Sequence, residues 1–245
     1  MIARRTRLLG SLALLAALGG TPAVAAEFTV VTTFSSGAEG WVGPTGIGGA
    51  TTLEATGGNP DHNLRTVFSD FGITFSNGPS TPFILDLTGH DAVAIAIDLR
   101  VEQIDFFGSP VSRPWLVELR DTTDAEPGYP WTSVWFKFDD VAAATHGSWT
   151  TFTVFVNDPD ATELPAGWGG YGAEDELGNP QLPEDRTFAS VLAGYDEIAF
   201  TTFEPGFLFG ETAHTVRIDN VTLRSAIFGD GFESESLAAW SSHSP

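Results

Sequence analysis

Short runs of β-branched and aromatic residues recur along this chain, separated by clusters of Gly, Pro, Asn, Asp and Ser. Such runs between turn-forming clusters predict strands. The expected strands are Phe28–Phe34, Thr51–Ala55, Asn63–Phe68, Gly72–Phe75, Phe83–Leu87, Ala92–Val101, Trp115–Asp121, Ser133–Asp139, Thr150–Val156, Glu197–Phe203 and His214–Arg224. Only a brief helical turn is expected after the first 26 residues, at Val141–Thr145. Many short strands without interleaved helices predict an all-β fold, an antiparallel β-sandwich of jelly-roll type.

Two of these runs alternate between apolar and other residues with a period of two, the period of a strand with one buried face. In the first run, from Ala92 to Arg100, Val and Ile residues at every second position lie on one face. In the second run, from Thr215 to Leu223, Val216 and Ile218 share a face with Asn220 and Thr222. The alternation predicts that both strands cover the core.

The first 26 residues have the order of a secretory signal peptide. Three arginines (Arg4, Arg5 and Arg7) precede an apolar run of Leu and Ala, and small residues follow up to Ala26. The apolar run is shorter than the roughly 20 residues that a membrane helix needs. We expect a signal peptide at residues 1–26, a β-sandwich domain at 27–225 and a tail at 226–245. The mature protein is then secreted past the inner membrane, without membrane insertion.

The charge balance excludes one class of partner. The chain has 11 basic and 32 acidic residues, a net charge of −21. Residues 1–26 hold three of the arginines and no acid, so the remainder has 8 basic and 32 acidic residues, a net charge of −24. Such a chain is not expected to bind nucleic acid, because that affinity depends on Lys and Arg neutralising phosphates. The charge suits cations or neutral ligands such as glycans.

The chain has no cysteine. An exported protein of this composition has no disulfides, so a core or a bound metal must stabilise it. The long segment Asn157–Arg186, rich in Gly, Pro and acids, is expected to be a functional loop.

Three segments, taken in order, resemble the layout of a known family. They are Phe34–Trp41 (FSSGAEGW), Gly57–Pro60 (GGNP) and Val216–Leu223 (VRIDNVTL). Their order and spacing resemble the laminin B (type IV A) domain and the wider set of galactose-binding-like and carbohydrate-binding jelly rolls. The resemblance spans about residues 28–224 and implies a non-catalytic β-sandwich. It also implies a structural calcium held by an acid of the closing strand and by the opening segment, here Asp219 and Glu39.

The calcium prediction agrees with the chemistry of the ion, which takes six to eight oxygen ligands. The alternative for Asp219 is that its carboxylate accepts hydrogen bonds from a neighbouring loop.

The segment Ile227–Ser241 (IFGDGFESESLAAWS) resembles a short ending that recurs in otherwise unrelated exported proteins of proteobacteria. A surface-attachment tag is one interpretation. A terminus that docks Trp240 on the sandwich is the other.

Exposed aromatic residues in loops are the candidates for ligand binding, because sugars stack their apolar faces on aromatic rings. Trp168 and Tyr171 flank two glycines in the long acidic segment, and Tyr129 and Trp131 lie in a Pro/Gly-rich turn. The alternative is that Trp168 and Tyr171 only pin the loop to the sandwich.

No catalytic motif is present. The sequence has no Gly-x-Ser-x-Gly elbow, and its five histidines never show His-x-x-x-His spacing. We therefore predict a secreted binding module, not an enzyme, for a glycan or a cell-surface matrix component. The alternatives are a structural or adhesive surface protein without a small ligand, and a hydrolase with two carboxylates converging in a cleft.

Overall fold

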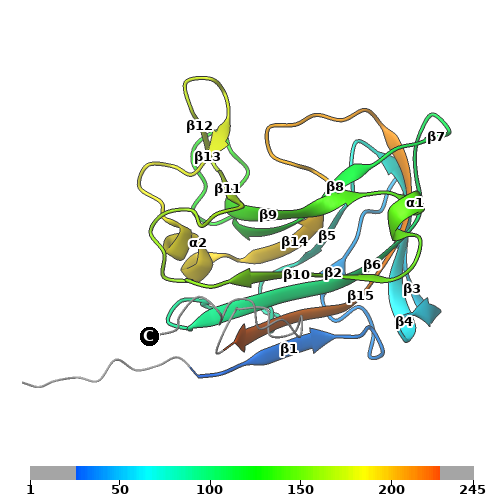
Figure 1. Ribbon diagram of the computed structural model, residues 1–245, viewed down its shortest axis with the longest axis horizontal. Helices are drawn as coiled ribbons and strands as arrows, with labels where there is room; N and C mark the ends of the chain where they lie inside the picture. The colour runs from blue at the N-terminus through cyan, green and yellow to red at the C-terminus, as the bar shows by residue number, and fades with distance from the viewer. Residues whose placement is uncertain (1–25, 227–245) are drawn as a thin grey trace, which may run out of the picture.

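The computed structural model describes residues 26–226, which form two antiparallel sheets packed face to face (Figure 1). The predicted all-β antiparallel sandwich of jelly-roll type is confirmed. The sequence feature responsible is the alternation in each strand, which gives each sheet one apolar face to bury. The expected signal peptide and almost all of the expected tail lie outside the described residues.

The first sheet has the strand order β10-β6-β15-β4-β3. Two further strands pair with it, β1 with β15 and β7 with β6. The strands are β1 (Thr29–Thr32), β3 (Gly49–Gly58), β4 (Asp61–Asp70), β6 (Ala92–Phe106), β7 (Ser109–Pro110), β10 (Thr150–Val156) and β15 (Thr212–Ala226). The two long strands β6 and β15 lie side by side at its centre and pair from Ala213 opposite Asp105 to Ala226 opposite Ala92, with two shifts of register between.

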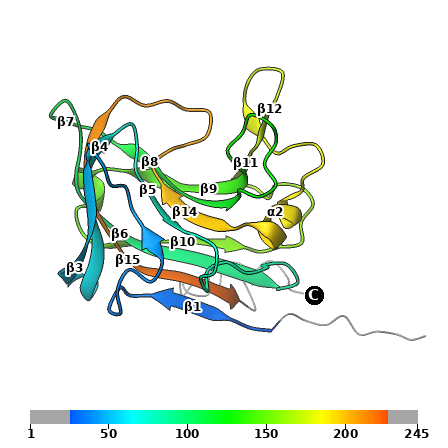
Figure 2. The ribbon, with the colours of Figure 1, turned by 180° about the vertical axis from the view of Figure 1, so that it is seen from behind.

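The second sheet has the order β11-β9-β8-β14-β5-β2. Its strands are β2 (Trp41–Val42), β5 (Thr74–Asn77), β8 (Arg113–Asp121), β9 (Thr132–Val141), β11 (Trp168–Tyr171) and β14 (Glu197–Thr201). A small separate pair, β12 (Ala173–Glu174) and β13 (Pro180–Gln181), follows β11 and projects beyond it, as both views show (Figures 1 and 2). The long acidic segment expected at residues 157–186 thus contains three short strands.

The core between the sheets combines Val, Ile and Leu side chains with a group of aromatic rings. Trp115 of β8 stacks on Phe200 of β14, and Phe75 of β5 meets Trp115 edge to face. All three side chains are buried. The predicted inward face of β6 is confirmed, because Val93, Ile95 and the apolar residues that alternate after them belong to the core.

One expected strand, Phe83–Leu87, is not a strand in the structure. Phe83 and Leu87 are buried, because this segment packs beside the helix α2 (Phe188–Gly194). The Tyr195 hydroxyl donates to the Phe83 carbonyl at 2.6 Å, and the Leu87 N–H donates to the Leu192 carbonyl at 3.2 Å. The apolar residues that predicted a strand are therefore buried in a loop that packs against a helix.

The face alternation predicted for the last strand changes in the middle of β15. Val216 and Ile218 are buried as expected, but farther on it is Val221 and Leu223 that are buried. The register shifts between Asp219 and Thr222, and Asn220 has a φ of 48°. A bulge with one left-handed residue turns the following side chains to the other face of the strand.

Two helices are present in residues 26–226: α2 and α1 (Ala143–His146), the latter beside the expected helical turn at Val141–Thr145. Neither is long and apolar enough to cross a bilayer.

Candidate functional site

A hollow of about 430 Å³ lies on the outer face of the second sheet, the face turned away from the core. Its lining comes from three places: the outward side chains of β8 and β5, the rings of Trp131 and Tyr171, and the start of the loop that joins β14 to β15. We call it the sheet groove. Its lining residues are Thr74, Glu118, Arg120, Trp131, Tyr171, Phe203, Glu204, Pro205, Gly206 and Phe207.

The floor of the sheet groove carries a buried ion pair. Glu118 and Arg120 are two residues apart on β8, so both point outward, while Val117 and Leu119 point into the core. The Glu118 carboxylate accepts from Arg120 Nε at 2.8 Å and lies 2.7 Å from Arg120 Nη2. Arg120 Nη1 donates to Glu197 of β14 at 2.7 Å.

The other oxygen of Glu118, Oε1, accepts from Trp131 Nε1 at 2.8 Å and from the Ser133 hydroxyl at 2.6 Å. Each charged group on the floor thereby has a partner, and the two carboxylates share one guanidinium. Burial alone would lower the pKa of Arg120, but Glu118 and Glu197 outweigh it and raise that pKa.

One wall of the sheet groove is aromatic. The Trp131 ring lies over the Arg120 guanidinium, whose carbon is 4.1 Å from the ring centroid. Tyr171 lies beside it, with ring centroids 6.0 Å apart, and Tyr129 meets Tyr171 edge to face at 5.5 Å. Three of the four aromatic residues expected to bind ligand are therefore brought together.

Burial, with the nearby Glu118 and Tyr129, raises the pKa of Tyr171. Its hydroxyl consequently stays protonated at neutral pH and available as a hydrogen-bond donor.

The opposite wall is the loop between β14 and β15, which arches over the sheet in Figure 1. Phe203 and Phe207 of this loop are 41% and 63% exposed. Glu204 lies between them and binds Lys137 Nζ at 3.0 Å. Gly206, at a φ of +83°, lies so close to Pro180 of β13 that an added Cβ would be 2.9 Å from the ring. A side chain at this position would push the loop away from β13.

Trp168, the fourth expected aromatic residue, lies on the other face of β11. Side chains alternate along a strand, so Trp168 and Tyr171, three residues apart, point in opposite directions. Trp168 is 8% exposed and packs on Phe136 and on Phe188 of α2. Trp168 therefore pins the segment to the core. This is the second of the two interpretations that the sequence left open for this ring. The loop expected here is a strand, and that decides the direction of the ring.

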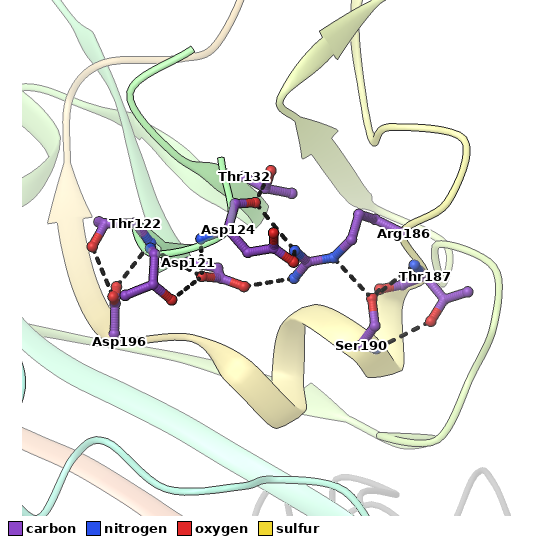
Figure 3. Close-up of polar contacts among 9 residues, drawn as sticks. Asp121, Thr122, Asp124, Thr132, Arg186, Thr187, Ser190 and Asp196 are labelled. Carbon is purple, nitrogen blue, oxygen red and sulfur yellow. Dashed lines mark hydrogen bonds and ion pairs between the residues drawn. The ribbon is translucent and has the colours of Figure 1, made fainter. Parts of the chain in front are cut away.

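The segment that carries Tyr171 is anchored at its end by Arg186 (Figure 3). Arg186 Nη2 binds Asp121 Oδ2 at 2.7 Å, and Nη1 binds Asp124 Oδ2 at 2.8 Å. Its Nε donates to Ser190 Oγ at 3.3 Å, and Ser190 forms a capping box with Thr187 at the start of α2. Burial alone would raise the pKa of Asp121, but hydrogen bonds from Arg186, Thr123 and Asp124 lower it. We call these contacts the Arg186 anchor.

The two residues expected to hold calcium have separate partners. Asp219 is fully buried, and its two carboxylate oxygens accept from the Asn59 N–H at 2.6 Å and the Asn220 N–H at 2.7 Å. Glu39 accepts instead from the Thr32 hydroxyl at 3.2 Å. In residues 26–226 no three His, Cys, Asp or Glu side chains gather into a group that could hold a metal ion. The contacts of Asp219 match the hydrogen-bonding alternative, and the calcium held by Asp219 and Glu39 stays a prediction.

Eight of the ten lining residues of the sheet groove were not expected from the sequence, among them Glu118, Arg120, Phe203 and Phe207. The charged pair had a signal, since Glu118 and Arg120 alternate with Val117 and Leu119 inside a predicted strand. Two opposite charges on the same face of a central strand indicate a polar surface with a specific arrangement. Phe207 had no such signal, because a loop position fixes no side-chain direction. Phe203 was expected to end the strand Glu197–Phe203, but β14 ends at Thr201 and Phe203 belongs to the loop that follows.

The carboxylates in and beside the sheet groove are all committed to basic partners. Glu118 and Glu197 share Arg120, and Glu204 binds Lys137. A glycosidase needs two carboxyl groups free to transfer a proton and to attack or activate water. This arrangement favours recognition over hydrolysis.

The described chain is thus an antiparallel β-sandwich with an aromatic-walled groove across one sheet. No protein-family model matches its sequence, and no curated protein matches it. Among solved structures it is similar to the family 11 carbohydrate-binding module from Clostridium thermocellum in complex with a β-1,3-1,4-mixed-linked tetrasaccharide. The TM-score is 0.49 and the identity 12%, over 83% of this chain and 99% of that one.

It is also similar to a xylan-binding domain of carbohydrate-binding module family 22, with a TM-score of 0.41 and 12% identity over 81% of this chain and 94% of that one. A third similar structure holds the N-terminal modules of endo-1,4-β-D-xylanase 10B from Clostridium thermocellum, with a TM-score of 0.43 and 14% identity. That match covers 82% of this chain but only 29% of the xylanase chain. Since these TM-scores lie below 0.5, we take neither a family nor a ligand from them.

Proposed function

We propose that this protein is a non-catalytic glycan-binding module, and that the sheet groove is where it binds its ligand. The observation that carries the proposal is the placement of aromatic rings on both walls of one hollow, Trp131 and Tyr171 on one side and Phe203 and Phe207 on the other. Sugar rings have apolar faces that stack on aromatic side chains and hydroxyls that need directed polar partners.

The polar groups of the groove suit hydroxyl recognition. The Tyr171 hydroxyl is a neutral donor. The Thr74 hydroxyl also lines the groove. Because each floor charge already has a partner, a neutral ligand can cover the floor without breaking an ion pair.

The test is affinity electrophoresis, followed by isothermal titration calorimetry, against a panel of soluble polysaccharides that includes a xylan, a mixed-linked β-glucan and a mannan. We expect one of them to bind, and we expect Trp131→Ala and Tyr171→Ala each to weaken that binding by about 2 kcal/mol, roughly 30-fold in Kd, as central aromatic contacts do.

Trp149→Ala is the matched control, because Trp149 is partly exposed but does not line the groove. It should bind like the unmodified protein. If Trp131→Ala and Tyr171→Ala bind as well as Trp149→Ala, the groove is not the binding site. If no polysaccharide binds at all, the structural or adhesive surface protein becomes the better interpretation.

The proposal includes export, on the basis of the signal-peptide order of residues 1–26. Expression of the full chain in a Gram-negative host should yield a periplasmic product whose N-terminus, read by mass spectrometry, begins at Ala26 or Glu27. A product that retains Met1 and stays in the cytoplasm would refute it.

The structural calcium is a prediction that comes from the resemblance alone. A thermal melt in EDTA and then in millimolar calcium measures it directly. A calcium ion bound only to the native state at about 100 times its Kd would add roughly 2.7 kcal/mol and raise Tm by several degrees. The same melts with Asp219→Asn show whether this residue contributes. Equal melting temperatures in EDTA and calcium would leave only the hydrogen-bonding role of Asp219.

A further inference from the structure

The feature with a role still unexplained is the depth of burial of Arg120. It lies on the outer face of the second sheet, yet it is only 7% exposed. The Trp131 ring lies over its guanidinium, at 4.1 Å. Burying a guanidinium is costly unless it is paired and hydrogen-bonded, and here Glu118 and Glu197 supply both. A buried ion pair often adds little net stability. The burial of this pair under Trp131 therefore suggests a role in holding the ring.

The same array holds the indole at two points. Glu118 Oε1 accepts from the ring edge, at Nε1, and Arg120 supports one ring face. Glu118 in turn binds Arg120 through its other oxygen. The edge contact and the face contact therefore belong to one rigid unit, fixed to β8. Trp131 itself precedes β9 in a Pro/Gly-rich turn, where the backbone alone would leave the ring free to choose a rotamer.

We propose that Arg120 is a positioning residue for ligand binding, which holds the Trp131 ring with one face on its guanidinium and the opposite face toward the sheet groove. This inference rests on the proposed function. A ring fixed before the ligand arrives does not lose its rotamer freedom on binding, so the ordering cost is removed from the binding free energy. Arg suits this role better than Lys, because a planar guanidinium stacks on a ring while still binding a carboxylate with two N–H groups.

The test is a double-mutant cycle on the polysaccharide that the unmodified protein binds. Arg120→Lys keeps the charge that Glu118 and Glu197 require but loses the planar stack. We expect it to weaken binding roughly 5- to 10-fold, the equivalent of ordering one side chain. In the Trp131→Ala background the same change should have no further effect, because the ring on which Arg120 acts is gone. If Arg120→Lys weakens binding equally in both backgrounds, Arg120 acts on the ligand directly or on the fold, and the inference is overturned.

Arg217→Lys is the matched control. Arg217 also binds two carboxylates, Glu102 and Glu54, but on the other sheet. It should lower Tm without changing affinity. A comparable loss of affinity in Arg217→Lys would mean that the effect of Arg120→Lys reports stability.

A second measurement does not need the ligand. In protein labelled with 5-fluorotryptophan, the ¹⁹F resonance of Trp131 is the one missing from Trp131→Phe among the seven tryptophans. We expect that resonance to shift or broaden in Arg120→Lys and to stay in place in Arg217→Lys. An unchanged resonance in Arg120→Lys would overturn the inference even if the protein binds glycan. Failure of every polysaccharide to bind, together with the expected ¹⁹F change, would instead overturn the proposed function and leave Arg120 as a structural support of Trp131.

Discussion

Replacing Arg186 by methionine is expected to destabilise the protein by roughly 3 kcal/mol, which at this chain length lowers Tm by roughly 6–12 °C. The side chains of Arg186 and Asp121 are only 10% and 5% exposed. Removing the guanidinium leaves the Asp121 carboxylate buried with a lone pair unpaired, which costs more than the pair itself contributes. The loss stays at the low end of the range for buried pairs, because Thr123 and the Asp124 N–H still donate to the other oxygen of Asp121.

The measurement is chemical denaturation together with a thermal melt, on Arg186→Met and on Arg100→Met. Arg100 is a partly exposed arginine that donates to the Gly147 carbonyl at 3.2 Å, so its loss should cost well under 1 kcal/mol. Adding Asp121→Asn to Arg186→Met should restore part of the lost stability, since it removes the unpaired charge. If Arg186→Met and Arg100→Met melt together, the Arg186 anchor does not stabilise the fold.

Acid is expected to destabilise the protein through His214 by about 3 kcal/mol as the pH falls from about 6.5 to about 4. His214 of β15 is 1% exposed, and burial with the neighbouring Arg113 lowers its pKa to about 4. The unfolded chain takes up a proton near pH 6.5 and the native protein only near pH 4. Between these values the unfolded state binds more protons, so stability falls as pH falls. Above pH 6.5 the contribution is fully present.

The measurement is the free energy of unfolding at several pH values for the native sequence and for His214→Leu. Neither ring nitrogen reaches a hydrogen-bond partner with good geometry, although backbone groups of Thr212 and Phe68 lie near the ring. Leucine at position 214 therefore leaves no hydrogen-bond partner unpaired. The free energy of unfolding of His214→Leu should depend less on pH between about 4 and 6.5. Carboxylates titrate in both proteins, so the difference between the curves isolates His214. Parallel curves for the native sequence and His214→Leu would contradict the assignment.

The strands could be predicted well where β-branched and aromatic residues recur between turn-forming residues. Thr150–Val156 was expected as a strand with the bounds that β10 has, and β6 carries the expected apolar face. The sequence was least informative where burial comes from a loop or from a helix. Phe83–Leu87 has the apolar content of a strand because it lies beside α2, a contact that links positions more than 100 residues apart.

The candidate site could be predicted by residue type but not by direction. Tyr129, Trp131 and Tyr171 were chosen because glycines and prolines surround them, and they do lie together. Trp168 was chosen on the same ground, yet β11 turns it into the core. The direction depends on the pairing of β11 with β9, and the short sequence Trp168–Tyr171 contains two glycines and no strand signal.

The bulge in β15 shows the same limit. The apolar residues before and after Asp219 are out of step by one position, which a strictly alternating strand would not allow. In retrospect this change of phase is visible in Val216–Leu223, and it marks the position where Asn220 adopts a φ of 48°. Two residues with a reversed phase inside a strong strand pattern are therefore a signal for a bulge.

One wall of the sheet groove comes wholly from the connection between β14 and β15, whereas its floor belongs to β8, a strand inside the second sheet. Evolution can therefore exchange this wall almost independently of the scaffold. A change of length or sequence in the β14–β15 loop would remodel one side of the groove and leave every ladder of the sandwich paired. Proteins with the same core but different β14–β15 loops could therefore bind ligands of different shapes. Grafting this loop from one such protein to another would transfer the ligand preference without a change to the core.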